Sequence, residues 1–115
     1  MLHTISLKGN ASFRRLYHRG ASAANRCLVM YCGRNRSRKN RVGLTVSAKL
    51  GHAVVRNRTR RRLREIYRLH EDRFLPGCDI VVVARSRAVE APFADLTASY
   101  LRLAEKAGIL REEAK

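Results

Sequence analysis

The strongest chemical signal in this sequence is a run of guanidinium groups between Val55 and Arg68. Successive residues of a helix are about 100° apart, so one arc would hold Asn57, Arg60, Arg61, Arg64 and Arg68. The opposite arc would hold apolar and small residues, namely Val55, Thr59, Leu63, Ile66 and His70. Glu65 is the only acid of the run, so the arginines would repel one another without an external polyanion. The spacing predicts a helix with one buried face and one face that binds phosphates.

The positive charge of the whole chain is concentrated in the same region. Residues 1–70 contain 18 Lys or Arg and one acid, whereas residues 71–115 contain 7 Lys or Arg and 8 acids. Surfaces that are merely solvated usually mix the two signs. The asymmetry therefore indicates a nucleic-acid-binding surface in the first part of the chain.

Groups that could catalyse a reaction do not cluster in the sequence. A two-metal nuclease needs gathered carboxylates, but the acids after Glu65 are scattered over the second part of the chain. The histidines lack the spacing of metal ligands or of an acid–base pair: His3, His18, His52 and His70. Cys27, Cys32 and Cys78 have no CxxC spacing and lie in or beside apolar runs, which predicts buried free thiols. We expect no catalytic residue and no bound metal in the polypeptide.

The length and composition predict one folded domain over residues 1–115. The chain is 45% hydrophobic and shows clear periodicity, which argues against disorder. No apolar run approaches the roughly 18 residues of a membrane span, and the N-terminus lacks the apolar core of a signal peptide. We expect a soluble cytoplasmic protein.

Three helices and three main strands are expected around the arginine run. A first helix begins at Asn10 or Ser12 and ends at Gly20, the arginine helix spans about His52 to Arg73, and a last helix begins near Pro92. The last helix carries a stripe that we expect in the core: Phe93, Leu96, Tyr100, Leu103, Ala104 and Ala107. The predicted strands are Arg26–Cys32, Val42–Ser47 and Asp79–Arg85. The continuous apolar run of the third strand is typical of the middle of a sheet.

The second strand predicts a sheet with two different faces. Val42, Leu44 and Val46 alternate with residues of the other face, which are Gly43, Thr45, Ser47 and then Lys49. We expect helices on the apolar face, giving an α/β fold, a two-layer α+β sandwich of order α-β-β-α-β-α. The segment Gly33–Arg41 contains five cations and no acid, and it is predicted to form an exposed hairpin loop.

Motifs along nearly the whole chain resemble a known family. These are Phe13 and Tyr17 followed by Gly20, an Ala-Asn-Arg at residues 24–26, and RVGLTVSAKLGHAVVRNRTRRRLRE at residues 41–65. The last motif contains Arg56-Asn57-Arg58, with Ser47, Lys49 and Gly51 before it. The chain resembles the protein component of bacterial ribonuclease P from about Leu7 to Ala107.

The resemblance implies a small cofactor of a large catalytic RNA. It implies that the arginine helix faces the RNA subunit and the substrate near the cleavage site, through Arg56, Asn57, Arg58, Arg60, Arg61, Arg64 and Arg68. It also implies a cleft for the 5′ leader of precursor tRNA, formed by Phe13, Tyr17, Tyr31, Ser47 and Lys49. Aromatic side chains can stack on unpaired bases of any sequence while cations follow the phosphates. The Mg²⁺ needed for cleavage would belong to the RNA subunit, and no protein partner or membrane would be required.

Two residues depart from the family pattern. Arg62 stands where an aliphatic residue is usual, at the margin of the buried arc, and we expect its side chain to extend outward to solvent. Ala48 stands where a second lysine is common, which removes one potential phosphate contact. The resemblance also implies a left-handed strand-helix-strand crossover, an exception to the usual right-handed rule.

Two other functional classes share part of this pattern. A ribosomal or RNA-chaperone protein could use the same basic helix without a catalytic partner, and only the aromatic cleft distinguishes it from the ribonuclease P class. A DNA-binding helix-turn-helix protein fits less well, because strands flank the arginine helix and no short helix and turn lead directly into it.

Overall fold

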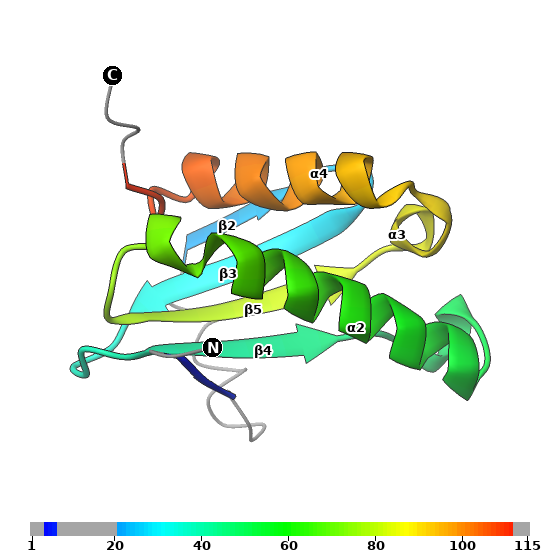
Figure 1. The fold of residues 1–115 in the computed structure, drawn as a ribbon, viewed down its shortest axis with the longest axis horizontal. Helices are drawn as coiled ribbons and strands as arrows, with labels where there is room; N and C mark the ends of the chain where they lie inside the picture. Colours follow the sequence, from blue (N-terminus) through cyan, green and yellow to red (C-terminus); the bar gives the residue numbers. More distant parts are fainter. Residues whose placement is uncertain (1–3, 7–20, 112–115) are drawn as a thin grey trace.

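The computed structural model describes residues 4–6 and 21–111, which form one mixed sheet with helices on one of its faces (Figure 1). The strands are β1 (Thr4–Ser6), β2 (Ala21–Ala24), β3 (Leu28–Arg34), β4 (Asn40–Thr45) and β5 (Cys78–Ala84). The helices are α2 (Ala53–His70), α3 (Ser86–Glu90) and α4 (Phe93–Lys106). Two short 3-10 helices, η1 (Ala48–Leu50) and η2 (Glu71–Arg73), flank α2. The predicted α/β class is confirmed.

The last strand of the chain occupies the centre of the sheet. The spatial order is β1-β4-β5-β3-β2, with β5 parallel to β4 and antiparallel to β3. Six of the seven residues of β5 are buried, as the apolar run at residues 79–85 predicts for a central strand. Among the described strands, β5 therefore joins the β1-β4 pair on one side to the β3-β2 pair on the other.

The predicted hairpin between β3 and β4 is wrong. Both strands are hydrogen-bonded to β5, which lies between them, so residues 35–39 form a connection that passes the start of β5. A hairpin is the usual choice for two strands joined by a short polar loop. Here the later strand inserts between them, and only tertiary pairing reveals this.

The crossover from β4 through α2 to β5 is left-handed. In Figure 1, β4 and β5 both run from left to right, α2 lies in front of the sheet, and β5 lies above β4. A right-handed unit would have placed β5 on the other side of β4. The resemblance predicted this hand, and general rules would have given the opposite one.

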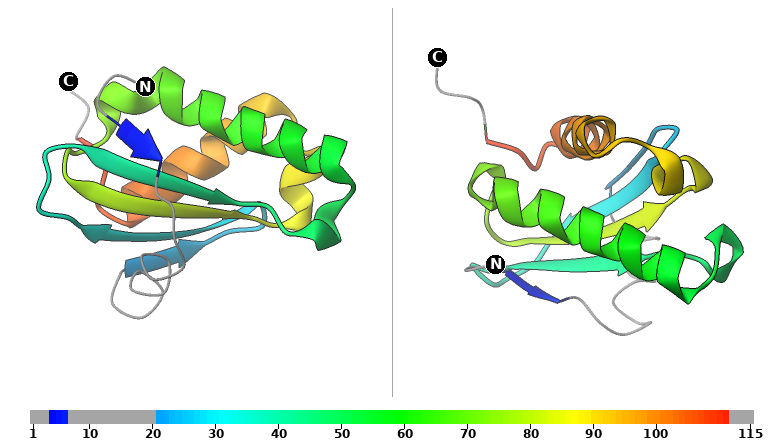
Figure 2. Two further views of the ribbon diagram at one scale, coloured as in Figure 1. Left: turned by 90° about the horizontal axis from the view of Figure 1, so that it is seen from below. Right: turned by 45° about the vertical axis from the view of Figure 1, so that its right-hand side comes forward.

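The core lies between the sheet and the layer formed by α2 and α4 (Figure 2). From the sheet come Leu28, Met30, Val42, Ile80 and Val82, all of which are buried. From α2 come Leu63, Ile66 and Tyr67, and the Tyr67 ring packs on Phe74 with 4.8 Å between centroids. Phe74 in turn contacts Tyr100 of α4 edge-on at 6.2 Å. This packing fixes the rotation of α2, and with it the direction of the arginines.

Several local predictions need correction. The strands begin or end about two residues from the predicted positions, and β1, β2 and α3 were not expected. Phe93, expected in the core, is 39% exposed, because α4 begins there and the buried stripe starts at Leu96. The predicted first helix at residues 10–20 lies outside the described residues.

Candidate nucleic-acid interface

The start of α2 is fixed by the short segment that joins it to β4. Ser47 accepts a hydrogen bond from the backbone N–H of Lys49 through its Oγ (3.2 Å) and so caps η1. Gly51 has φ +149, and a Cβ at this position would lie 2.9 Å from Cγ1 of Val55. The residue must be glycine for the chain to turn this closely into the helix.

One face of α2 is exposed along its length, and between residues 57 and 68 its exposed side chains are those of arginines and one asparagine. Val54 before this stretch and Leu69 after it are exposed apolar residues. The exposed polar residues of the predicted set are Asn57, Arg58, Arg61, Arg64 and Arg68, while Arg56 and Arg60 are half-buried. The opposite face is buried through Thr59, Leu63 and Ile66, as predicted, together with Tyr67. Val55 and His70 lie half-buried at its margins. The two-faced helix expected from the spacing is confirmed.

Few contacts neutralise the exposed arginines. Arg68 donates from Nε to Oε2 of Glu65 (3.0 Å) and also from Nη2 to Oε1, and these hydrogen bonds lower the pKa of Glu65. Arg60 donates to Oδ1 of Asn57 at 3.2 Å. Within the described residues, no ion pair with a carboxylate is made by Arg58, Arg61 or Arg64. Their charge is directed to solvent.

The cationic face is wide because it reaches both borders of α2. On one border Arg62 contacts α3, and Arg58 lies one turn before it. On the other border the Tyr67 hydroxyl accepts a hydrogen bond from Asn40 of β4 (3.1 Å), and Arg60 lies two turns before Tyr67. Arg56 lies on this second border, and its buried Nε has no partner among the described residues.

The Arg62 side chain was predicted to extend to solvent, and this prediction is wrong. Its guanidinium folds against α3 and donates from Nη1 to the carbonyl of Ala88 (3.3 Å) and from Nη2 to that of Ala91. Burial, and then the nearby charge of Arg58, lower its pKa. The carbonyls at the end of a helix lack intrahelical donors, so Arg62 fills a structural role that its unusual position in the sequence did not reveal.

The sheet face turned away from α2 and α4 carries the described part of the predicted cleft. Tyr31 is half-buried there beside Val83 and the fully buried Val81. Ser47 and Lys49 are exposed just beyond the end of β4. Phe13 and Tyr17 lie outside the described residues.

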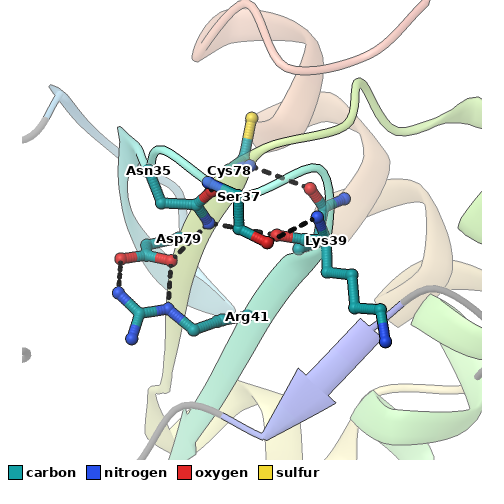
Figure 3. Close-up of polar contacts among 7 residues, drawn as sticks. Asn35, Ser37, Lys39, Arg41, Cys78 and Asp79 are labelled. Carbon is teal, nitrogen blue, oxygen red and sulfur yellow. Dashed lines mark hydrogen bonds and ion pairs between the residues drawn. The ribbon is translucent and has the colours of Figure 1, made fainter.

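A polar network at the other end of β4 and β5 was not predicted (Figure 3). Arg41 donates from Nε to Oδ1 of Asp79 (2.7 Å) and from Nη2 to Oδ2 (2.5 Å), and hydrogen bonding to Asp79 raises the pKa of Arg41. Asn35 donates from Nδ2 to the same Oδ1 (2.8 Å) and to the carbonyl of Lys39 (3.1 Å), while its Oδ1 accepts from the Ser37 N–H. Gly77 lies close by, since a Cβ there would meet the Ser37 carbonyl at 2.9 Å. The basic connection is thus held in one conformation by Asn35 and Asp79.

Cys27, Cys32 and Cys78 are buried and unbonded, as expected, and burial raises the pKa of Cys32 and of Cys78. In residues 4–6 and 21–111, no three His, Cys, Asp or Glu side chains gather in a way that could hold a metal ion. None of the helices described there has the length and apolar character needed to cross a membrane.

Comparisons with known proteins agree with the geometry. The family model described as Ribonuclease P matches residues 1–108. The ribonuclease P protein component of Clostridioides difficile strain 630 is 42% identical over 107 residues, which cover 92% of this chain and 94% of the relative. The solved RNase P protein of Staphylococcus aureus superposes with a TM-score of 0.84 at 36% identity, covering 92% of this chain and 97% of that one. The RNase P protein of Thermotoga maritima gives 0.78 at 29% identity, with coverages of 84% and 92%. On both sequence and fold, the chain belongs to the ribonuclease P protein family.

Proposed function

We propose that this chain is the protein subunit of a ribonuclease P holoenzyme, binding the catalytic RNA subunit and the 5′ leader of precursor tRNA. The observation that carries the proposal is the exposed cationic face of α2 on a chain of this family. Arginines without carboxylate partners are suited to phosphates, because each guanidinium offers a planar fork of donors. The holoenzyme would remove the leader to give the mature tRNA 5′ end.

We propose that one set of residues on α2 contacts both the RNA subunit and the substrate near the cleavage site. The set is Arg56, Asn57, Arg58, Arg60, Arg61, Arg64 and Arg68. Its width, from the α3 border to the β4 border, suits two RNA segments at once. Arg68 would contribute less than Arg61 or Arg64, because Glu65 already accepts two of its hydrogen bonds.

We propose that the leader binds on the face of the sheet that carries Tyr31 and contacts Ser47 and Lys49 as well. The ring of Tyr31 can stack on an unpaired base, and Lys49 can contact a phosphate. Ser47 already accepts the Lys49 N–H, so its hydroxyl would act as a donor toward the leader. Phe13 and Tyr17 complete the proposed set on the strength of the resemblance.

In this proposal the polypeptide performs no bond cleavage. The Mg²⁺ ions of the reaction would be bound by the RNA subunit, and the arginines would lower the repulsion between two polyanions. The consequence is a lower magnesium requirement for the complex than for the RNA alone.

The test is cleavage of precursor tRNA by RNA-free protein, by the RNA subunit, and by their mixture over a magnesium series. Leader removal by the mixture at magnesium concentrations where the RNA alone is inactive is the expected result. Leader removal by the protein alone would overturn the assignment. Purification of the tagged protein with ribosomes rather than with one large RNA would favour the RNA-chaperone class.

A further inference from the structure

Arg41 lies on the same face of β4 as the proposed leader contacts, at the opposite end of the strand. Residues 41, 43 and 45 of β4 share the face turned away from α2, because alternate residues of a strand point the same way. Gly43 and Thr45 add no bulky side chain between Arg41 and the exposed Ser47. At about 3.3 Å per residue, Arg41 and Ser47 are roughly 20 Å apart.

The guanidinium of Arg41 is held by Asp79 but keeps donors that are open to a ligand. Asp79 is buried, with 11% of its side chain exposed, and it accepts from Nε and one Nη2 hydrogen of Arg41. The Arg41 side chain is 33% exposed. The described residues offer no hydrogen-bond partner to its Nη1. A planar group fixed along one edge and open along the other can accept a phosphate at the open edge.

The carboxylate that holds Arg41 is itself positioned. Asn35 donates to Oδ1 of Asp79, and the backbone N–H of Asn35 donates to the Gly77 carbonyl at 2.8 Å. Figure 3 shows Asn35 and Arg41 converging on Asp79 from two sides. Because the network fixes its orientation, Arg41 would lose little side-chain freedom on binding.

We infer that Arg41 binds a phosphate of the leader several nucleotides upstream of the cleavage site, with Asp79 as its positioning residue. This inference rests on the proposed function, which places the cleavage site near α2. Figure 1 shows the start of α2 at the same end of the sheet as the end of β4. The stretch of the sheet face from Ser47 to Arg41 is called the leader track, and Arg41 lies at its end far from α2's first turn. At the stacked spacing of about 3.4 Å per nucleotide the track holds at most about six nucleotides, and fewer when the strand is extended.

The experiment measures equilibrium binding of precursor tRNA to the assembled RNA–protein complex. The substrates carry leaders of about two or about eight nucleotides, on either side of the length that the track can hold, and a non-cleavable linkage at the cleavage site. The variant is the double substitution Arg41→Gln with Asp79→Asn, which keeps the net charge and leaves two amides that can hydrogen-bond. The matched control is Arg38→Gln, which removes an exposed cation from the neighbouring connection at residues 35–39. Arg38 lines a cavity with Glu71 and Asp72 on the helix side.

The double variant should bind the long-leader substrate about tenfold more weakly, the loss of roughly one charge-assisted contact, and the short-leader substrate unchanged. Arg38→Gln should not alter the ratio of the two affinities. Equal losses for both substrates, or no loss, would overturn the inference. If the double variant does not fold, Arg41→Lys replaces it, since lysine satisfies Asp79 but lacks the planar fork.

A different result would count against the proposed function itself. The unaltered complex should bind the long-leader substrate more tightly than mature tRNA. Without that difference, the leader track and the role of Arg41 in it are both wrong. With that difference but an unchanged ratio in the double variant, only the role of Arg41 is wrong.

Discussion

The exposed face of α2 and the segment Gly33–Arg41 are both rich in arginine, but the guanidinium groups of the two regions have different partners. Arg58, Arg61 and Arg64 have no carboxylate partner among the described residues. By contrast, Arg41 is paired with the buried Asp79, and Arg62 at the border of α2 is bonded to two carbonyls. Positive charge in a sequence therefore does not identify a phosphate-binding residue by itself. The partners that the fold supplies decide how much of a guanidinium is available to a ligand: all of it in Arg61 and Arg64, one edge in Arg41, and little in Arg62.

The largest expected effect concerns the free arginines. If roughly six to eight cations engage phosphates, affinity for the RNA subunit should fall by about 10³-fold or more between 50 and 200 mM salt. Arg61→Ala and Arg64→Ala should each reduce the slope of log affinity against log salt by about one. The measurement is a salt titration of binding. A slope shallower than about −2 in the unaltered protein would show that phosphate contacts do not dominate.

The paired arginine should matter most for folding. Arg41→Ala leaves the buried carboxylate of Asp79 without its bidentate partner, and the free energy of unfolding should fall by about 2 kcal/mol. The value lies below that of a fully buried pair because Arg41 is partly exposed. Urea unfolding measures the loss, with Arg38→Ala as the exposed control. An equal and small effect of the two substitutions would show that the Asp79 pair is no more than a surface contact.

The sheet face should distinguish leader from mature tRNA. Tyr31→Ala should weaken binding of precursor tRNA by about 1 kcal/mol, the contribution of one stacked base, and leave mature tRNA nearly unchanged. Binding of both substrates to the assembled complex is the measurement. An equal loss for the two would assign Tyr31 to the fold or to the RNA subunit.

The smallest expected effect is that of Arg62. Replacing it by leucine exchanges two hydrogen bonds to carbonyls for apolar packing against α3, so stability should change by less than about 1 kcal/mol. The salt slope of RNA binding should stay the same, because this guanidinium is not directed to solvent. A slope reduced by one would place Arg62 with the free arginines and remove the distinction between free and hydrogen-bonded guanidinium groups.

The sequence predicted the features that depend on periodicity. Helical spacing in α2 is local, so its buried face through Leu63 and Ile66 was predicted correctly. The continuous apolar run of β5 is also local, and it correctly indicated the central position of this strand. The features that depend on long-range pairing were missed. Asn35 and Asp79 are 44 residues apart, and the bonds of Arg62 reach 26 and 29 residues along the chain. No spacing within one element indicates such partners.

The position of β5 also determines when the sheet can form during synthesis. Neither β3 nor β4 pairs with the other, and both wait for residues 78–84. A nascent chain that ends before β5 already contains most of the arginines and lysines. It lacks the strand that joins the β1-β4 pair of the sheet to the β3-β2 pair. Because non-local pairing slows folding, we expect such a chain to remain without a stable sheet, whatever the stability of α2 alone. Pulsed proteolysis of stalled chains would show protection arising only once β5 has left the ribosome.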